Sequence, residues 1–475
     1  MTSSPATPIR LRQPATVIVL ATAFVAMTSI TSSSAFAENT VHWQAGPGGS
    51  LLLVEENPTL PIVTVTVAAR TGAAADPEHL AGLSNMAGEV ARRGAGGKTR
   101  EQLDDALDDL GASLDVLADT ESVRFVGRVL SKNFNPFMDL LADVILRPTF
   151  DQSEVNGTRR EVVGQLAESR NDDRSLCARN FSRRLWGRHP YGQPADGTEA
   201  SLKRMKKTVL QRHFKSQFSG SNVIFAATGD ITTAAFSKAL EARFDKLPNA
   251  PATTLKIPKA SPPQGWRIQL VDKPDRQQVQ MMFGQLGLPA THPDYVPLSI
   301  AMTAFGGHAM NATLMKEVRT ERGWAYGAYM SVIPHRQVGA LNGWVFTGVD
   351  HAVDTLRLVL RLYTELTQTP APDEAVAFFK KFLAGAYASE LDSPSARLWR
   401  RVLAEIQGLP RDWVDTFAQK VTDTSAADVR RAVVNHLKPH DLAITLVATA
   451  DVLLPKLQAA GIDAAAVDVT AFTAF

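Results

Sequence analysis

Cysteine is nearly absent from this sequence, whose 475 residues include only Cys177. A single cysteine excludes a disulfide within the chain. The neighbours of Cys177, which include Ser175, Ala178 and Arg179, suggest no metal cluster. We therefore expect a packed or idle thiol.

A dominant charge is also missing. The chain has 50 Lys and Arg against 48 Asp and Glu, a formal net charge of +2. Nothing in this balance points to nucleic acid or to an anionic membrane. The sequence also lacks a GxSxG elbow, a P-loop and a dinucleotide fingerprint, so the enzyme classes that those motifs mark gain no support.

Long apolar runs are missing beyond the N-terminus. Arg10 and Arg12 precede an apolar run at Ala15–Met27, which is too short for a transmembrane helix. Small residues follow and end in Ala35-Phe36-Ala37, an A-x-A cleavage signal. We predict a signal peptide over 1–37 and a periplasmic or secreted mature chain that does not stay on the membrane. A retained membrane anchor is the alternative.

The remaining chain has the pattern of a large globular protein with alternating strands and helices. Hydrophobic residues make up 45% of it, which supports sizeable cores, and the length suggests two to four domains. The first half is expected to contain strands at Leu51–Glu55, Ile62–Ala69, Ser113–Ala118, Val123–Leu130 and Val223–Thr228, and helices at Leu80–Arg93, Arg100–Leu110, Phe134–Leu146, Ser153–Arg184 and Ala234–Asp245.

Residues 249–265 are rich in proline and carry neither periodicity, so we interpret them as a linker between domains 38–248 and 266–475. The second half repeats the order of the first. Strands are expected at Trp266–Leu270, Val279–Gly284, Tyr329–Ile333, Gly339–Thr347 and Asp441–Val447, and helices at Tyr295–Phe305, Leu314–Val318, Ala352–Thr367, Pro372–Leu391 and Val452–Ala460.

One pair of segments indicates a duplication. FAATGDITTAAFSKAL in the first half and LVATADVLLPKLQAAG in the second are each a strand, a short turn with Asp and an amphipathic helix. The sequence therefore predicts an α+β protein of two homologous domains. Each domain would have a mixed or antiparallel sheet covered by helices on one face.

The segment Leu314–Tyr329, LMKEVRTERGWAYGAY, carries the clearest candidate site. Its apolar positions have helical spacing, Gly323 ends the helix, and a strand follows. Arg319 then lies on the last helical turn and Tyr326 at the start of the strand. A guanidinium and a phenol that converge there would offer donors to a peptide carbonyl or its oxyanion. A solvated Arg and a Tyr within a sheet are the plainer interpretation.

Arg-x-x-x-Gly-x-x-Tyr after an amphipathic helix resembles the second-domain motif of the pitrilysin or insulinase type of zinc peptidase, which includes the mitochondrial processing peptidases. The preceding Gly306-Gly307 and NATLMKEVR are similar to its glycine-rich turn. The resemblance implies a metallopeptidase-like fold of the LuxS and processing-peptidase kind, with two like domains facing each other across a cleft. It also implies that Arg319 and Tyr326 bind and polarise the substrate peptide.

The zinc motif of that family, His-x-x-Glu-His on a first-domain helix, is missing here. After Gly82-Leu83, the five motif positions hold Asn85, Met86, Ala87, Gly88 and Glu89. Both histidines and the general base are therefore absent.

The other candidate ligands give no zinc site either. The third ligand of the family aligns with Leu166, and Glu168 lies two positions away on another face. His436 and His440 are four residues apart, but Pro439 between them disrupts the helix that they would need. We therefore expect this chain to bind no metal.

This chain has the substrate-binding Arg and Tyr of the family but not its zinc site. The resemblance implies a role for such a chain, because some family members work as pairs of homologous chains. We expect a zinc-less subunit of an exported heterodimeric metallopeptidase, inactive alone, with Arg319 and Tyr326 serving a partner that carries the zinc. Its substrates would be unfolded or short peptides. The alternatives are an inert scaffold or peptide-binding homologue, and a peptidase that acts alone, which would need a metal site that the sequence does not show.

Overall fold

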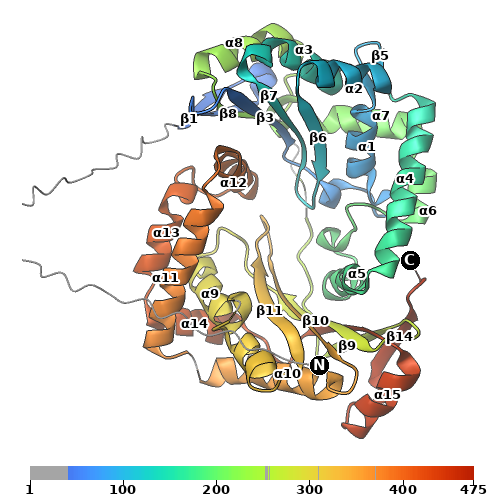
Figure 1. Cartoon of the computed structure of the whole chain (residues 1–475), viewed down its shortest axis with the longest axis vertical. Coiled ribbons are helices and arrows are strands. Elements are labelled where there is room, and N and C mark those ends of the chain that lie inside the picture. The colour runs from blue at the N-terminus through green and yellow to red at the C-terminus, as the bar shows by residue number, and fades with distance from the viewer. Residues whose placement is uncertain (1–40, 252–254, 256, 309, 370, 475) are drawn as a thin grey trace, which may run out of the picture. The chain divides into compact units, whose positions relative to one another are not determined.

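The computed structural model describes residues 41–251, 255, 257–308, 310–369 and 371–474 (Figure 1). The described residues belong to one compact unit, Thr40–Phe475. The expected signal peptide at 1–37 lies outside them. No described helix combines the length and the apolar character that a membrane span requires.

The first half is built on a mixed sheet. Its strands lie in the order β1 (Val41–Ala45), β2 (Leu51–Glu56), β8 (Val223–Gly229), β3 (Ile62–Ala69), β7 (Val123–Leu130) and β6 (Ser113–Ala118). Strands β2 and β8 pair in parallel and the other neighbours pair antiparallel. Buried β-branched residues fill β3, as its sequence predicts. Strand β6 is left at one edge of the sheet.

Helices of the first half cover one face of this sheet, and an apolar core lies between them and the strands. Val63, Val65 and Val67 of β3 point into that apolar core. The helices are α1 (Leu83–Ala91), α2 (Arg100–Asp109), α3 (Phe134–Leu146), α4 (Gln152–Asn171), α5 (Asp173–Trp186), α6 (Glu199–Arg204), α7 (Lys207–Gln217) and α8 (Thr233–Phe244), and a small hairpin joins β4 (Gly94–Ala95) to β5 (Lys98–Thr99).

The second sheet repeats the first with one change. Its order is β11 (Ala325–Ile333), β12 (Ala340–Gly348), β10 (Gln278–Leu286), β13 (Ala443–Ala448), β9 (Arg267–Asp272) and β14 (Val467–Ala471). The central parallel pair recurs as β9 and β13, and β11 takes the edge position of β6. The outer strand β14 runs parallel to its neighbour, whereas β1 runs antiparallel. The predicted duplication and the α+β architecture are thereby confirmed.

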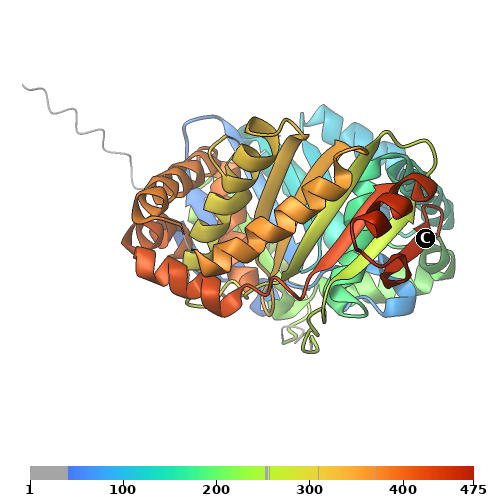
Figure 2. The same cartoon turned by 90° about the horizontal axis from the view of Figure 1, so that it is seen from below.

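Helices again cover one face of this sheet, and Figure 2 shows α9 and α10 lying across it. The helices of the second half are α9 (Tyr295–Met302), α10 (Ala352–Gln368), α11 (Asp373–Glu390), α12 (Pro394–Gln407), α13 (Trp413–Asp423), α14 (Ala426–His436) and α15 (Ala450–Ala459).

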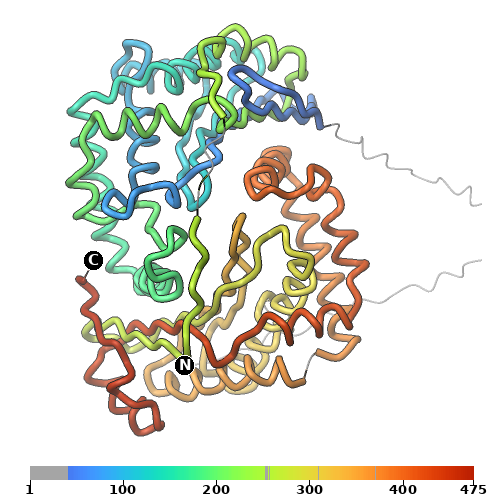
Figure 3. The backbone as a smooth tube through the Cα atoms, turned by 180° about the vertical axis from the view of Figure 1, so that it is seen from behind, coloured from blue at the N-terminus to red at the C-terminus, as the bar shows by residue number. Residues whose placement is uncertain are grey.

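The opposite face of each sheet receives a helix from the other half, an arrangement that the sequence does not predict. Helix α5 packs on β10 and β13, where Figures 1 and 3 both place it. Cys177 of α5 is buried there and its thiol donates to the Thr445 carbonyl, 3.4 Å away. Reciprocally, Leu398, Val402 and Ile406 of α12 pack on the first sheet. The two halves thus exchange helices.

The long helical region expected over Ser153–Arg184 consists of two helices, α4 and α5. The chain turns at Asp172, where extended backbone separates α4 from α5. The Asp172 side chain accepts a hydrogen bond from the backbone N–H of Ser175, so it caps the new helix. The break re-aims α5 toward the second sheet.

Candidate functional site

The segment with Arg319 has the expected order of elements, with a different helical geometry. Met315–Thr320 is a short π-helical segment, a form that is rare and often found at functional sites. Leu314, Met315 and Val318 are buried, as their spacing predicts. Gly323 has a φ of +65°, which allows the reversal into β11.

Arg319 and Tyr326 lie close together, as the turn at Gly323 between them allows. The Arg319 Cζ lies 4.7 Å from the centroid of the Tyr326 ring. The β11–β12 register shifts between Ala325 and Gly327, so Tyr326 occupies a bulge. Its side chain is 73% exposed, which leaves the ring and the phenol accessible from solvent.

Tyr326 also lines an open cavity of about 690 Å³. The cavity lies between α5 and the face of β11 and β12 that is turned toward α5. This volume lies in the range of ligand-binding sites. The cavity is lined by Arg174, Ala178, Met282, Tyr326, Gly327, Tyr329, Ser331, Ile333, Asn342, Trp344 and Phe346. It was missed at the sequence level because Arg174 reaches it only through the exchange of α5.

The five altered motif positions lie on α1. Met86, Ala87 and Gly88 are buried, and Asn85 and Glu89 are half-buried. A Cβ atom at position 88 would lie 2.8 Å from the Val116 side chain, so the place of the general base is filled by the neighbouring strand. Burial raises the pKa of Glu89 against the opposing effect of Arg93 and Arg92.

Arginine side chains surround the altered motif positions on α1, where a metal cation would need anionic or neutral ligands. Arg93 makes a bidentate ion pair with Glu161, with distances of 2.9 and 2.6 Å, and lies 3.8 Å from Glu89. With Arg92 and Arg100, it lines a cavity of about 550 Å³ beside β6. The carboxylates that also line this cavity include Asp104, which pairs with Arg92 and Arg100. The residues present therefore do not fit zinc, which binds neutral imidazole, thiolate or carboxylate.

Neither proposed third ligand changes this conclusion. Leu166 is buried in the core of the first half, and Glu168 is exposed on α4. Glu161 of α4, which no sequence pattern singles out, is linked to Glu89 of α1 through Arg93. No local pattern connects Glu161 with Arg93, because they are 68 positions apart.

Within the described residues, His292, Asp294 and His436 are close enough to hold a metal ion. Asp294 is already engaged, however, by Arg431 at 2.7 Å and by the His436 Nε2 at 2.8 Å. Its second oxygen and its charge are therefore committed to neighbours. His436 and His440 do not share a helix, as Pro439 between them predicts, since α14 ends at His436.

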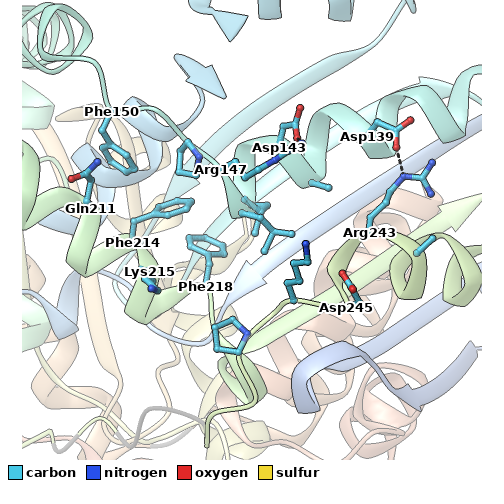
Figure 4. A pocket seen from close by; sticks show the side chains of 17 residues that line it. Asp139, Asp143, Arg147, Phe150, Gln211, Phe214, Lys215, Phe218, Arg243 and Asp245 are labelled. Atoms are coloured by element: carbon cyan, nitrogen blue, oxygen red, sulfur yellow. Dashed lines mark hydrogen bonds and ion pairs between the residues drawn. The ribbon is translucent and has the colours of Figure 1, made fainter. Parts of the chain in front are cut away.

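A larger cavity of about 840 Å³ lies between α3, α7 and α8, on the first half (Figure 4). Phe214 and Phe218 contribute apolar surface, while Arg243 pairs with Asp139 at 2.6 Å on its rim. It shares no lining residue with the cavity at Tyr326.

Two duplicated α+β halves, an exchanged pair of helices and an Arg–Tyr contact in the second half define a peptidase-like protein whose metal motif is replaced. Family models agree with this description. Residues 51–199 match "Insulinase (Peptidase family M16)" and residues 204–383 match "Peptidase M16 inactive domain". The chain belongs to the insulinase family of peptidases, which confirms the resemblance.

Similar proteins include both peptidase-named and non-peptidase members. An uncharacterized zinc protease YmxG of Bacillus subtilis is 22% identical over 74% of this chain and 85% of its own length. A non-peptidase homolog YmxG of Helicobacter pylori is 20% identical over 83% of this chain and 91% of its own. A crystal structure of a peptidase M16 inactive domain from Pseudomonas fluorescens, 23% identical, covers 86% of this chain and 97% of its own, with a TM-score of 0.80; this likeness concerns the fold.

Proposed function

We propose that this chain is the zinc-less subunit of an exported metallopeptidase formed with a homologous, zinc-bearing partner. The observation that carries the proposal is the accessible contact between Arg319 and Tyr326, whose Cζ atom and ring centroid are 4.7 Å apart. This contact occurs in a chain whose α1 lacks the zinc ligands of the family. The partner would supply the zinc and its activated water. Export rests on the predicted signal peptide.

In this proposal Arg319 and Tyr326 hold the substrate backbone. The guanidinium and the phenol both donate hydrogen bonds, and an oxyanion accepts stronger ones than a carbonyl does. Preorganised hydrogen-bond donors therefore stabilise the negative charge of the transition state more than they stabilise the bound substrate. The exposed bulge at Tyr326 would bring them to an extended peptide, which favours unfolded or short substrates.

The second candidate is a catalytically inert scaffold or peptide-binding homologue. It is favoured by the match of residues 204–383 to an inactive domain and by the description of the Helicobacter pylori relative as a non-peptidase. An inert scaffold would have no use for the Arg–Tyr pair. A peptide-binding homologue would use it for capture alone.

The deciding experiment combines the purified chain with a homologous exported subunit that has an intact zinc motif. The pair should hydrolyse a quenched fluorescent peptide, and a chelator should stop the reaction. Arg319→Ala should lower kcat/KM by about 100- to 1,000-fold, the usual effect of losing one oxyanion donor. Lys316→Ala, at an exposed position of the same segment, is the matched control.

Wild-type turnover by the Arg319→Ala pair would remove the assigned role. If the wild-type chain adds nothing to the partner's own activity, the inert alternative is correct. Circular dichroism of each variant would show that the fold is retained.

A further inference from the structure

Four aromatic rings form a continuous row along the cavity at Tyr326. Tyr329 and Trp344 face each other across β11 and β12 and stack at 5.7 Å with an interplanar angle of 9°. Phe346 lies 5.3 Å further along from Trp344, and Tyr326 lies 6.4 Å from Phe346. The Trp344 indole donates to the Gln280 side chain at 2.9 Å, which fixes the centre of the row.

Two guanidinium groups lie over this row. Arg174, from α5, lies 4.0 Å from the centroid of Trp344, and Arg319 lies 4.7 Å from that of Tyr326. The two cations thus contact rings on either side of Phe346. Cation–π contact positions a guanidinium over a ring without a hydrogen-bond acceptor.

The donors of both guanidiniums are unused in the described part of the chain. Neither Arg174 nor Arg319 has an ion pair or a side-chain hydrogen bond there, and no acidic residue lines the cavity. The nearby Asp172 interacts with the charge of Arg174 but forms no ion pair with it, and its side chain caps α5. Asp173 pairs with Lys273 at 2.5 Å. The cavity therefore combines apolar ring surface with two guanidinium groups whose hydrogen-bond donors are unused in the described part of the chain.

We propose that this cavity selects peptide segments in which a carboxylate adjoins an apolar or aromatic side chain. The inference rests on the proposed peptide-holding function and names its substrate class. The planar fork of a guanidinium fits a carboxylate with two parallel hydrogen bonds, and the ring faces suit the neighbouring apolar group. The carboxylate is that of an Asp or Glu side chain or that of a free C-terminus.

The test measures binding of fluorescein-labelled short peptides to the full chain by fluorescence anisotropy. The peptides share one Leu- and Phe-rich sequence and differ by Asp or Asn at one internal position, each made with a free or an amidated C-terminus. The form with the recognised carboxylate should bind roughly tenfold more tightly than its uncharged counterpart. The Asp/Asn pair and the acid/amide pair identify which carboxylate is recognised.

Arg174→Gln should abolish this preference, measured as the ratio of the affinities for the charged and the uncharged peptide. Arg183→Gln removes the same charge from an exposed position of the same helix, outside the cavity, and should leave the preference intact. Equal binding of all peptides, or a preference that survives Arg174→Gln, overturns the inference but leaves peptide holding in place. If the wild-type chain binds none of the peptides, the inference and the peptide-holding part of the proposed function both fail.

Discussion

Asp294 is the residue at which three segments of the second half meet. It precedes α9, and its carboxylate accepts hydrogen bonds from Arg431 and His436 of α14. Its backbone N–H donates to the His292 Nδ1, 3.0 Å away. The hydrogen bond from Arg431 is the largest of the effects that lower the pKa of Asp294, and His436 contributes in the same direction. The carboxylate therefore serves as a structural anchor rather than as a metal ligand.

This arrangement predicts an acid-sensitive contribution to stability. Because the folded-state pKa of Asp294 is depressed, its contribution is present above the unfolded-state value of about 3.9 and is lost as the pH falls through the folded-state value. Urea midpoints measured from pH 7 to pH 3 should show Asp294→Asn less stable than wild type at neutral pH, with the two curves converging at the acid end. Asp109→Asn, at an exposed position of α2, should parallel wild type throughout. Parallel curves for Asp294→Asn would refute the linkage.

Residues differ in how far their contacts could be predicted from the sequence. Arg319 and Tyr326 were predictable because seven residues and one glycine turn connect them. The ion pair of Arg93 with Glu161 and the contact of Arg174 with Trp344 were not, because both join segments far apart in the chain. Local spacing contains no information on such contacts, which depend on how the elements pack.

Among the elements, the strands were predicted best. Alternating or continuous β-branched runs located β2, β3, β6 and β7 to within a residue of their observed bounds. The helices between residues 394 and 436 were not predicted. Among these helices, α12 matters most for the fold. Its apolar stripe packs on a sheet from the other half, a partner that periodicity alone does not reveal.

Helix α12 is held on the first sheet by a buried charge. Glu55 of β2 is 0% exposed, and its Oε1 accepts from Arg397 of α12 at 2.8 and 2.6 Å. Arg397→Met should therefore lower the free energy of unfolding by about 3–5 kcal/mol, because Glu55 is left buried and unpaired. Chemical denaturation provides the measurement.

The double variant Arg397→Met/Glu55→Leu separates the buried charge from the lost packing. Replacing a buried ion pair by apolar residues is often neutral, so this variant should recover most of the lost stability. If it is no more stable than Arg397→Met alone, the ion pair is not what holds α12.

At the scale of the whole molecule, the exchange of α5 and α12 makes the two halves depend on each other. Polar contacts add to the two apolar interfaces: Arg70 pairs with Glu405 at 3.0 Å, and Glu121 of the first half accepts from the backbone N–H of Arg336 at 3.0 Å. The described part of the proline-rich segment also packs on α5, through Leu255 and Ile257. A duplication predicted from sequence would suggest two separable domains, and the exchange argues against that.

Cutting the connection between the halves should therefore leave them together. A specific protease site inserted between Gln264 and Gly265, both exposed, would allow cleavage of the folded chain. Separation would expose Leu398, Val402 and Ile406 of α12, at about 1.5–3 kcal/mol for each side chain, and the buried face of α5 as well. The two fragments should co-elute with the uncut chain in size-exclusion chromatography at neutral pH. In the Arg397→Met background, they should part at a lower urea concentration. Fragments that elute separately in native buffer would show that the exchanged helices do not hold the halves together.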